Sequence, residues 1–332
     1  MKGTKIRWGI LGCGRIARKF AADLRLVDDA ELTAIASRNK ETLELFAKDF
    51  PCKHHHNSYE ALVANNEVDV IYVATPHSHH YEHTMLCLNH NKAVLCEKAF
   101  AINSRQAKEM IKTAKERKVF LMEALWTKFL PHYKKLLELL QQKILGDIKS
   151  VLVNFGFKPS DKSPQRLFDP SLGGGSLLDI GIYNVFITLS VLGKPDSMEA
   201  TMIPSPTGID EQIAVLFKYN NGAMAQLFSS FVTNLPTQAE INGTEGCITL
   251  TTRFYEPSTI IQLSKKLPYE REVITVEKEA GFGYHYEARH VNECLKKGLI
   301  ESPVMTHADT LTLMEVLDTI RMKAGLKYPV DL

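Results

Sequence analysis

The stretch Ile6-Arg7-Trp8-Gly9-Ile10-Leu11-Gly12-Cys13-Gly14-Arg15-Ile16-Ala17 decides the fold. Its first six residues are mostly apolar and predict a buried strand, and residues 16–24 have the apolar spacing of a helix. The GxGxxA pattern lies between them: Gly12 permits a tight turn, Gly14 lets the backbone approach a ligand, and Ala17 lets the helix pack closely on the strand. In this context the pattern indicates a dinucleotide-binding turn rather than a bare structural turn.

The helix that follows this turn begins beside the expected phosphates. Its first backbone amides are unpaired within the helix, and its dipole places partial positive charge at the same end. Both features favour a pyrophosphate at this position. The cofactor contacts predicted here are Gly12, Gly14, Arg15 and Ile16.

Strand-like and helix-like segments alternate over the first third of the chain. Strands are expected at residues 6–11, 31–36, 68–74, 93–96 and 119–122, and helices at 16–24, 41–49, 80–89 and 104–117. Such alternation predicts a doubly wound parallel sheet with helices on both faces, a Rossmann domain. The run His54-His55-His56 is expected to be a surface loop.

The pattern changes near Glu123. Helices are expected at residues 131–143, 177–192, 286–297 and 308–324, a strand at 149–157, a loop rich in Pro, Ser and Gly at 159–175, and alternating short strands at 198–276. The predicted fold class is therefore α/β, with a Rossmann domain over residues 1–123 and an α+β domain over residues 124–332. The second domain is expected to hold a large, predominantly antiparallel sheet.

Composition narrows the class of protein. The 332 residues are 45% hydrophobic and 23% charged with a net charge of +2, which suits a soluble globular protein of two domains and gives no basic patch for nucleic acid. We expect no membrane partner, because no apolar run approaches the roughly 18 uncharged residues of a span. Residues 1–7 lack the pattern of a signal peptide. Since the six cysteines are scattered without a CxxC pair, we expect reduced thiols and a cytoplasmic location.

The end of the second strand predicts the choice of cofactor. An NAD site usually has a carboxylate there, which binds the ribose 2′-hydroxyl. This chain has Ser37-Arg38-Asn39 instead, and Arg38 can hold a 2′-phosphate by charge. We therefore predict NADP in preference to NAD, with Ser37 and Arg38 as contacts. The alternative is that Arg38 is a solvated surface residue.

The strand at residues 68–74 leads into Thr75-Pro76-His77. Strand carboxyl ends line the ligand crevice in such sheets, so the predicted cofactor contacts include Thr75, Pro76, His77 and His80. Four histidines cluster here: His77, His79, His80 and His83. No acidic or thiol partner has a clear ligand spacing, so no metal is predicted.

The strand at residues 93–96 leads into Glu97-Lys98. A lysine at this point would project into the crevice beside the nicotinamide, where it can bind a substrate hydroxyl and lower the pKa of a neighbouring acid. Glu97 and Lys98 are also predicted cofactor contacts. The alternative is an ordinary surface ion pair between them.

A second candidate segment follows three glycines at 173–175. Asp179 is the only charged residue between Asp169 and Lys194, so we expect a buried carboxylate that is paired or functional. Tyr183 lies four residues later, on the same helical face. A tyrosine beside a lysine ammonium has a lowered pKa and can take a proton from a hydroxyl. The alternatives are that Asp179 caps the glycine loop and that Tyr183 is a core aromatic.

Taken together, these motifs give a family resemblance over essentially the whole chain. They are GCGRIA at residues 12–17, VDVIYVATPHSHH at 68–80, LCEKAF at 95–100 and GGGSLLDIGIY at 173–183. The chain resembles the glucose–fructose oxidoreductase/inositol dehydrogenase/rhizopine catabolism (Gfo/Idh/MocA) family. EALWTKFLP at 123–131 and the tyrosine at 183 resemble its branch of dimeric dihydrodiol dehydrogenases and NADP-dependent D-xylose dehydrogenases. The resemblance implies Lys98 and Tyr183 as the catalytic pair, Asp179 in support, Trp126 as a pocket wall, and a homodimer through the antiparallel sheet.

The chain departs from the family pattern at two positions. Ala99 stands where the family usually has proline, often in a cis bond, so the backbone that supports Lys98 is expected to differ. Lys128 stands where the branch often has arginine, which argues against a bidentate contact there.

These observations predict an NADP(H)-dependent oxidoreductase. It would transfer a hydride between the nicotinamide and a hydroxyl or carbonyl carbon of a sugar, a polyol or a cyclic trans-diol. The alternative is a non-catalytic NADP(H)-binding regulator or sensor. The predicted substrate contacts are Trp126, Phe157, Arg166 and Tyr183, where aromatic walls suit an apolar ring diol or the flat faces of a sugar. His132 is a further candidate for reaching substrate hydroxyls.

Overall fold

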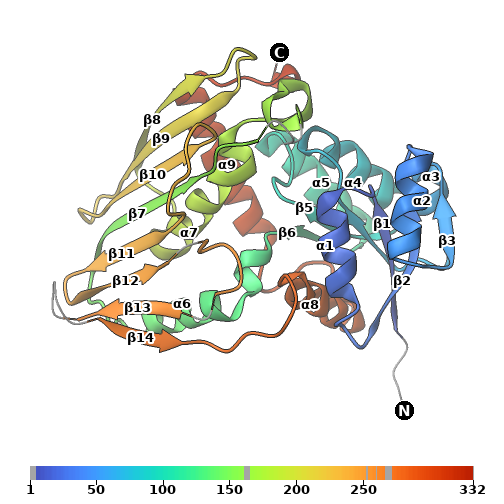
Figure 1. Cartoon of the computed structure of the whole chain (residues 1–332), viewed down its shortest axis with the longest axis horizontal. Helices are drawn as coiled ribbons and strands as arrows, with labels where there is room; N and C mark the ends of the chain where they lie inside the picture. The colour runs from blue at the N-terminus through green and yellow to red at the C-terminus, as the bar shows by residue number, and fades with distance from the viewer. Residues whose placement is uncertain (1–4, 161–164, 252, 259, 266–270, 332) are drawn as a thin grey trace. The chain divides into compact units, whose positions relative to one another are not determined.

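The computed structural model describes residues 5–160, 165–251, 253–258, 260–265 and 271–331. The chain forms two compact units, coloured by residue number in Figure 1: one comprises Met1–Lys128 and Glu279–Leu311, the other Phe129–Lys278 and Thr312–Leu332. The predicted division at residues 123 and 124 lies near the first crossing between the units. The prediction placed Glu279–Leu311 in the second domain, whereas in the structure this segment belongs to the first unit. Residues 1–4, on which the signal-peptide interpretation partly rests, and 161–164 of the predicted loop lie outside the described residues.

Six parallel strands form the sheet of the first unit. They are β1 (Ile6–Leu11), β2 (Ala30–Ala36), β3 (His54–His56), β4 (Val70–Val73), β5 (Ala93–Glu97) and β6 (Leu121–Ala124), in the order β3-β2-β1-β4-β5-β6. The order reverses between β1 and β4, and ligands of open α/β sheets bind beyond the carboxyl ends of the strands at such a switch point. The predicted Rossmann domain is confirmed.

Helices connect these strands. They are α1 (Arg15–Leu24), α2 (Lys40–Asp49), α3 (Tyr59–Val63), α4 (His80–Asn89) and α5 (Ser104–Arg117), with the 3-10 turn η1 (His77–His79) before α4. Side-chain caps explain where two of them begin: Asn39 accepts a hydrogen bond from the amide of Thr42 at 2.8 Å, and Asn103 accepts one from Gln106 at 3.0 Å. The buried face of α5 follows helical spacing, with Ala107, Met110, Ile111 and Ala114.

The histidine run at residues 54–56 is a strand, not the surface loop that the sequence predicted. β3 pairs in parallel with residues 34–36 of β2 and forms the edge of the sheet. Three polar residues give no apolar alternation, which is why the pattern did not indicate a strand. A short polar edge of this kind also discourages pairing with another chain.

The late segment of the first unit is held by polar contacts. Asp23, at the end of α1, is 1% exposed and accepts hydrogen bonds from the amides of Phe282, Gly283 and Tyr284 at 2.9, 2.7 and 2.8 Å. These amides precede or begin α8 (Tyr284–Lys296), so the carboxylate of Asp23 satisfies backbone donors at the start of this helix. The indole of Trp8 donates to Asn292 at 3.0 Å. The segment therefore completes the Rossmann unit.

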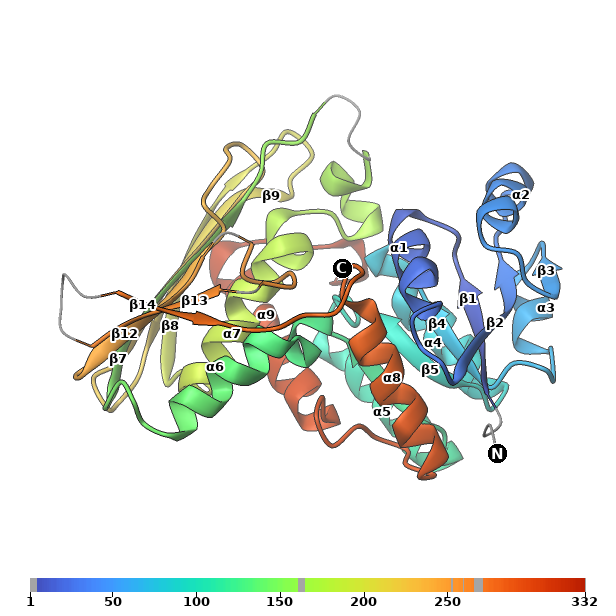
Figure 2. The ribbon, with the colours of Figure 1, turned by 60° about the horizontal axis from the view of Figure 1, so that its bottom comes forward.

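Eight strands form the sheet of the second unit. They are β7 (Ile148–Gly156), β8 (Ser197–Pro204), β9 (Asp210–Lys218), β10 (Met224–Ser230), β11 (Ala239–Gly243), β12 (Gly246–Leu250), β13 (Ile260–Ser264) and β14 (Glu272–Thr275), in the order β14-β13-β12-β11-β7-β10-β9-β8. Only the β7–β10 pair is parallel among the described pairings, so the predicted, mostly antiparallel sheet is confirmed. In Figure 2, α6 (Pro131–Gln141) and α7 (Ile182–Leu192) lie on the same side of this sheet.

The helix predicted over residues 177–192 has two parts. Leu177–Gly181, labelled η5, is a π-helical turn, and α7 continues from it. The sequence analysis expected no segment long and apolar enough to cross a membrane. By length and composition Pro170–Leu192 is such a segment, although it contains Asp179. Of its apolar window, 72% is buried within the protein, as expected for a core helix.

Candidate active site

The turn between β1 and α1 has the geometry that the glycine pattern predicts. Gly12 has φ +96°, and a Cβ there would lie 3.0 Å from the carbonyl oxygen of Ala74, so the position requires glycine. A Cβ on Gly14 would meet nothing within 4 Å. Ala17 is fully buried. The turn therefore packs tightly on its sheet side and is open at Gly14, where a pyrophosphate can approach.

Charge at the start of α1 suits an anion. Arg15 is exposed, Ile16 is half-buried, and the first turn contains no acidic residue. The partial positive charge of the helix end is therefore not neutralised by a carboxylate of its own first turn.

Ser37 and Arg38 lie directly after β2. Ser37 is buried, and its hydroxyl accepts a hydrogen bond from the amide of Asn39 at 3.2 Å. Arg38 is exposed, with its guanidinium carbon 5.4 Å from the centre of the Tyr59 ring. The ring orients the guanidinium and leaves its charge accessible, as a 2′-phosphate contact requires.

His80 has a different environment from the one predicted for a cofactor contact. It is fully buried, with Nδ1 2.7 Å from the carbonyl oxygen of Ala99 and Nε2 2.8 Å from that of Thr75. Only the doubly protonated ring can donate to both oxygens. His80 therefore links the segments that follow β4 and β5 and does not point a ring nitrogen at a ligand.

The other predicted contacts after β4 lie close by. Pro76 precedes η1, His77 lies within it and is 5% exposed, and the His77 ring is 5.7 Å from the His80 ring, nearly perpendicular to it. These residues follow the strand at the switch point, which is the position that the cofactor prediction requires.

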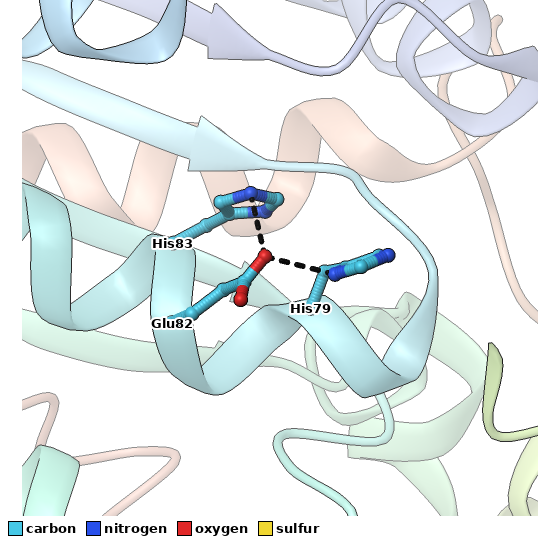
Figure 3. A group of neighbouring side chains, drawn as sticks. All are labelled: His79, Glu82 and His83. Carbon is cyan, nitrogen blue, oxygen red and sulfur yellow. Dashed lines mark hydrogen bonds and ion pairs between the residues drawn. The ribbon is translucent and has the colours of Figure 1, made fainter. Parts of the chain in front are cut away.

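The histidines after β4 have an acidic partner that the sequence analysis missed. Figure 3 shows Glu82 between His79 and His83, with its Oε1 atom 2.8 Å from Nδ1 of His79 and 3.2 Å from Nε2 of His83. The expectation that no acidic side chain is suitably spaced was therefore wrong. Glu82 lies three residues after His79 and His83 lies four residues after His79, so both side chains are on the face of the helix that His79 occupies.

Lys98 directly follows β5 and is half-buried. Its amide donates to the carboxylate of Glu97 at 3.2 Å, and the hydroxyl of Tyr72 donates to the other oxygen of the same carboxylate. Glu97 is only 6% exposed, so the alternative of an ordinary surface ion pair is wrong. The Lys98–Ala99 peptide bond is cis, so the expectation that the backbone would differ at Ala99 was also wrong.

Trp126 and Lys128 have partners within the first unit. The ring of Trp126 is 4% exposed and stacks on Tyr284, with centroids 4.4 Å apart and planes 3° from parallel. Lys128 forms an ion pair with Asp309 at 2.8 Å. The sequence pattern gave no signal for Tyr284 or Asp309, because both lie more than 150 positions later in the chain.

Tyr183 belongs to an aromatic cluster in the second unit. It lies in the first turn of α7, and its ring centroid is 6.0 Å from that of Phe155 and 4.8 Å from that of Tyr255. Phe155 and Tyr255 also stack, at 4.4 Å. Tyr255 was missed, since it lies between β12 and β13 in a stretch without periodic pattern.

Asp179 lies on the π-helical turn and pairs with Arg166. Both terminal nitrogens of the guanidinium lie 3.2 Å from Oδ1 of Asp179, whose side chain is 12% exposed. The expected pairing of this carboxylate is therefore present. Arg166, predicted to contact substrate, here holds a carboxylate.

Asp210 anchors the glycine loop and was not predicted from the sequence. It is fully buried and accepts hydrogen bonds from the hydroxyl of Ser176 at 2.8 Å and the amide of Leu177 at 2.6 Å. Gly175 has φ +115°, and a Cβ there would lie 2.2 Å from Oδ1 of Asp210. Burial raises the pKa of Asp210 to about 7. The carboxylate therefore fixes the start of the segment that carries Asp179 and Tyr183.

Two other candidates have structural partners. Phe157 is half-buried, with its ring 5.3 Å from that of Phe231. His132 is fully buried, with Nε2 2.9 Å from the carbonyl oxygen of Phe254, so it ties α6 to the loop that carries Tyr255 and does not reach toward substrate.

The predicted site residues thus fall into two groups. Lys98, Trp126 and all the cofactor contacts belong to the first unit, while Phe157, Arg166, Asp179 and Tyr183 belong to the second. The first group surrounds the switch point of a nucleotide-binding sheet. The second combines a tyrosine hydroxyl, flat aromatic faces and a paired carboxylate, which suits recognition and deprotonation of a hydroxylated ring.

Comparison with known proteins supports this division. The family model "Oxidoreductase family, NAD-binding Rossmann fold" matches residues 6–125, and the "GFO/IDH/MocA C-terminal domain" matches residues 133–249. The chain is 37% identical over 329 residues to trans-1,2-dihydrobenzene-1,2-diol dehydrogenase of Xenopus tropicalis, covering 97% of this chain and 99% of that protein.

Solved structures resemble the whole chain. A 3-ketoreductase from Actinomadura kijaniata in complex with NADP and TDP-benzene has a TM-score of 0.86 at 26% identity, covering 97% of this chain and 98% of that one. Levoglucosan dehydrogenase in complex with NADH and levoglucosan has a TM-score of 0.85 at 19% identity and the same coverage, which shows the fold alone. The family match and the dehydrogenase relatives favour an enzyme over a non-catalytic sensor. The chain belongs to the Gfo/Idh/MocA family of oxidoreductases and is an enzyme with an NAD(P)-binding Rossmann unit.

Proposed function

We propose that the protein is an NADP(H)-dependent dehydrogenase or reductase of a cyclic trans-diol, a sugar or a polyol. The observation that carries the proposal is the end-to-end similarity to a trans-dihydrodiol dehydrogenase. Lys98 after β5 and Tyr183 in the first turn of α7 support it from the structure.

The chemistry is assigned to Tyr183, Lys98 and Asp179. Gly12, Gly14 and Arg38 would hold NADP+, which would supply the hydride acceptor for the substrate carbon. Tyr183 accepts the proton of the substrate hydroxyl, and Lys98 supplies the positive charge that favours the deprotonated oxygen. Asp179, held by Arg166, orients the segment from which Tyr183 projects. In the reverse direction Tyr183 returns the proton to the carbonyl oxygen.

The preference for NADP rests on Ser37 and Arg38. Of the solved structures that the chain resembles, one is in complex with NADP and another with NADH, so the resemblance supports only NAD(P). The exposed guanidinium of Arg38, oriented by Tyr59, supports a preference for the cofactor that carries a 2′-phosphate.

Substrate recognition is assigned to the aromatic cluster of Phe155, Tyr183 and Tyr255. Its flat faces suit a ring, whether an apolar cyclic diol or a sugar. The test measures reduced-nicotinamide absorbance with NADP and NAD separately, over aldoses, polyols and cyclic trans-diols. Turnover with NADP on at least one of these classes is expected. Tight NADPH binding with no turnover on any of them, in either direction, would overturn the proposal.

The functional form is a homodimer through the outer face of the eight-stranded sheet. Leu152 of β7 and Met224 of β10 are 41% and 43% exposed on that face, while Val151 and Val153 point inward. Leu152→Lys is expected to shift the mass measured by light scattering toward the monomer. Met322→Lys, on α9 (His307–Ala324), is the control and should leave the mass unchanged.

All six cysteines are free. The cytoplasmic location and the absence of nucleic-acid and membrane partners stay predictions from the sequence.

A further inference from the structure

We propose that His79, Glu82 and His83, at the start of α4, form a binding site for a divalent transition metal of the zinc class. His79 ends η1, Glu82 and His83 lie in the first turn of α4, and Figure 3 shows Glu82 between the two histidine rings. The proposal is independent of the dehydrogenase activity and of the substrate.

Donor geometry supports the site. One ligand atom from each side chain lies within 4.8 Å of the other two. The Oε1 atom of Glu82 is already 2.8 Å from His79 and 3.2 Å from His83. A tetrahedral zinc ion with ligand bonds of about 2 Å needs donors roughly 3.3 Å apart, so small rotations of the two less buried side chains suffice.

His83 is held in place before any metal arrives. It is 5% exposed, and its Nδ1 atom lies 3.0 Å from the hydroxyl of Thr75. The ring also packs at a steep angle against Tyr59, with centroids 4.7 Å apart. A hydroxyl on one nitrogen can fix the tautomer that presents the lone pair of the other, which is how proteins orient metal-binding imidazoles.

Charge also suits a cation. The carboxylate of Glu82 supplies negative charge between the two imidazoles.

The donor types select the metal. Two imidazoles and one carboxylate match the ligands of zinc, cobalt and nickel, whereas magnesium and calcium prefer oxygen alone. Glu82 is exposed and His79 is half-exposed, so a fourth position is open to water. Three protein ligands and one open position are typical of an exchangeable or catalytic site rather than of a closed structural one.

The test uses the tag-free full chain, titrated with Co2+ and followed by visible absorption, and with Zn2+ by calorimetry. We expect one equivalent to bind with the absorption of a low-coordinate cobalt site. Glu82→Gln and His79→Gln change less buried side chains and should fold normally, and each is expected to abolish that absorption. Thr75→Val keeps all three ligands and should weaken Zn2+ binding about 10- to 100-fold.

The matched control removes the other histidine group. His54→Gln combined with His56→Gln deletes two histidines of β3, one of which pairs with Glu67, and should leave the cobalt signal intact. Loss of binding in this control alone would overturn the proposal. Binding that survives both Glu82→Gln and His79→Gln, or no binding by the wild-type chain, would do the same.

Discussion

Arg166 places both terminal guanidinium nitrogens 3.2 Å from a single oxygen of Asp179. If the two residues act as a unit, removing either one should have nearly the same effect on kcat/KM as removing both. For Arg166→Ala and Asp179→Asn we expect a coupling energy on the order of 0.5–3 kcal/mol. The measurement is a double-mutant cycle on kcat/KM.

An exposed pair in the same unit provides the control for this cycle. Lys194 lies 3.3 Å from Glu315, with both side chains partly or largely exposed, so its cycle should give a coupling near zero. Strictly additive losses for Arg166 and Asp179 would mean that Arg166 contacts substrate independently.

Arg38→Ala should change cofactor selectivity. Loss of a charge-assisted contact worth about 1.5–3 kcal/mol raises the Kd of NADPH roughly 10- to 100-fold, while the Kd of NADH should hardly change. Fluorescence titration of both cofactors measures this. Arg25→Ala is the matched control, since Arg25 lies 4.8 Å from the centre of the Phe50 ring in a similar arrangement. Equal weakening of NADPH and NADH would contradict the assignment.

Lys98→Ala should abolish most turnover without preventing cofactor binding. Removing proton-transfer support lowers kcat by about 10² to 10⁴. The measurement is kcat with saturating NADP, together with the Kd of NADPH. Lys112→Ala, an exposed substitution on α5, should retain full activity. Wild-type turnover in Lys98→Ala would remove Lys98 from the catalytic set.

Asp23 should make the free energy of unfolding depend on acidic pH. Burial raises the pKa of this carboxyl, but hydrogen bonds from His285, Phe282 and Tyr284 outweigh it, so the pKa lies below its ordinary value. A lowered folded pKa stabilises the protein above the unfolded value, about 4, and this contribution is lost as pH falls further. Asp23→Asn should cost about 1–3 kcal/mol at pH 7 and flatten the acid limb of the urea-unfolding profile. An unchanged acid limb would contradict this.

Asp210 should have the opposite pH dependence. Burial raises its pKa to about 7, so the folded state binds the proton more tightly than the unfolded chain. The contribution of Asp210 to the free energy of unfolding is therefore fully present below about pH 4 and is lost as pH rises through 7, by up to about 4 kcal/mol. Asp210→Asn should remove this decline between pH 5 and 8 in urea unfolding. A wild-type profile parallel to that of the variant would show that Asp210 is ionised throughout.

Local pattern determined much of the Rossmann unit. The strand at residues 6–11, the helices at 80–89 and 104–117, and the turn at Gly12 are all as predicted. Each depends on neighbours within a few positions, through apolar periodicity or a backbone angle that only glycine adopts readily. The sequence likewise predicted that Lys98 directly follows a parallel strand, which gives it a defined place at the sheet edge.

By itself, then, the sequence determined the order of most elements and the nucleotide-binding turn, and it predicted the candidate catalytic residues. The tertiary structure decided which side chains meet: Asp23 with Gly283, 260 positions apart, Asp210 with the glycine loop, and Tyr255 with Tyr183. Such contacts produce no periodic pattern in the sequence, because each depends on a single residue from a distant element. Their polar members can be recognised only in the folded structure, where buried polar groups need hydrogen-bond partners.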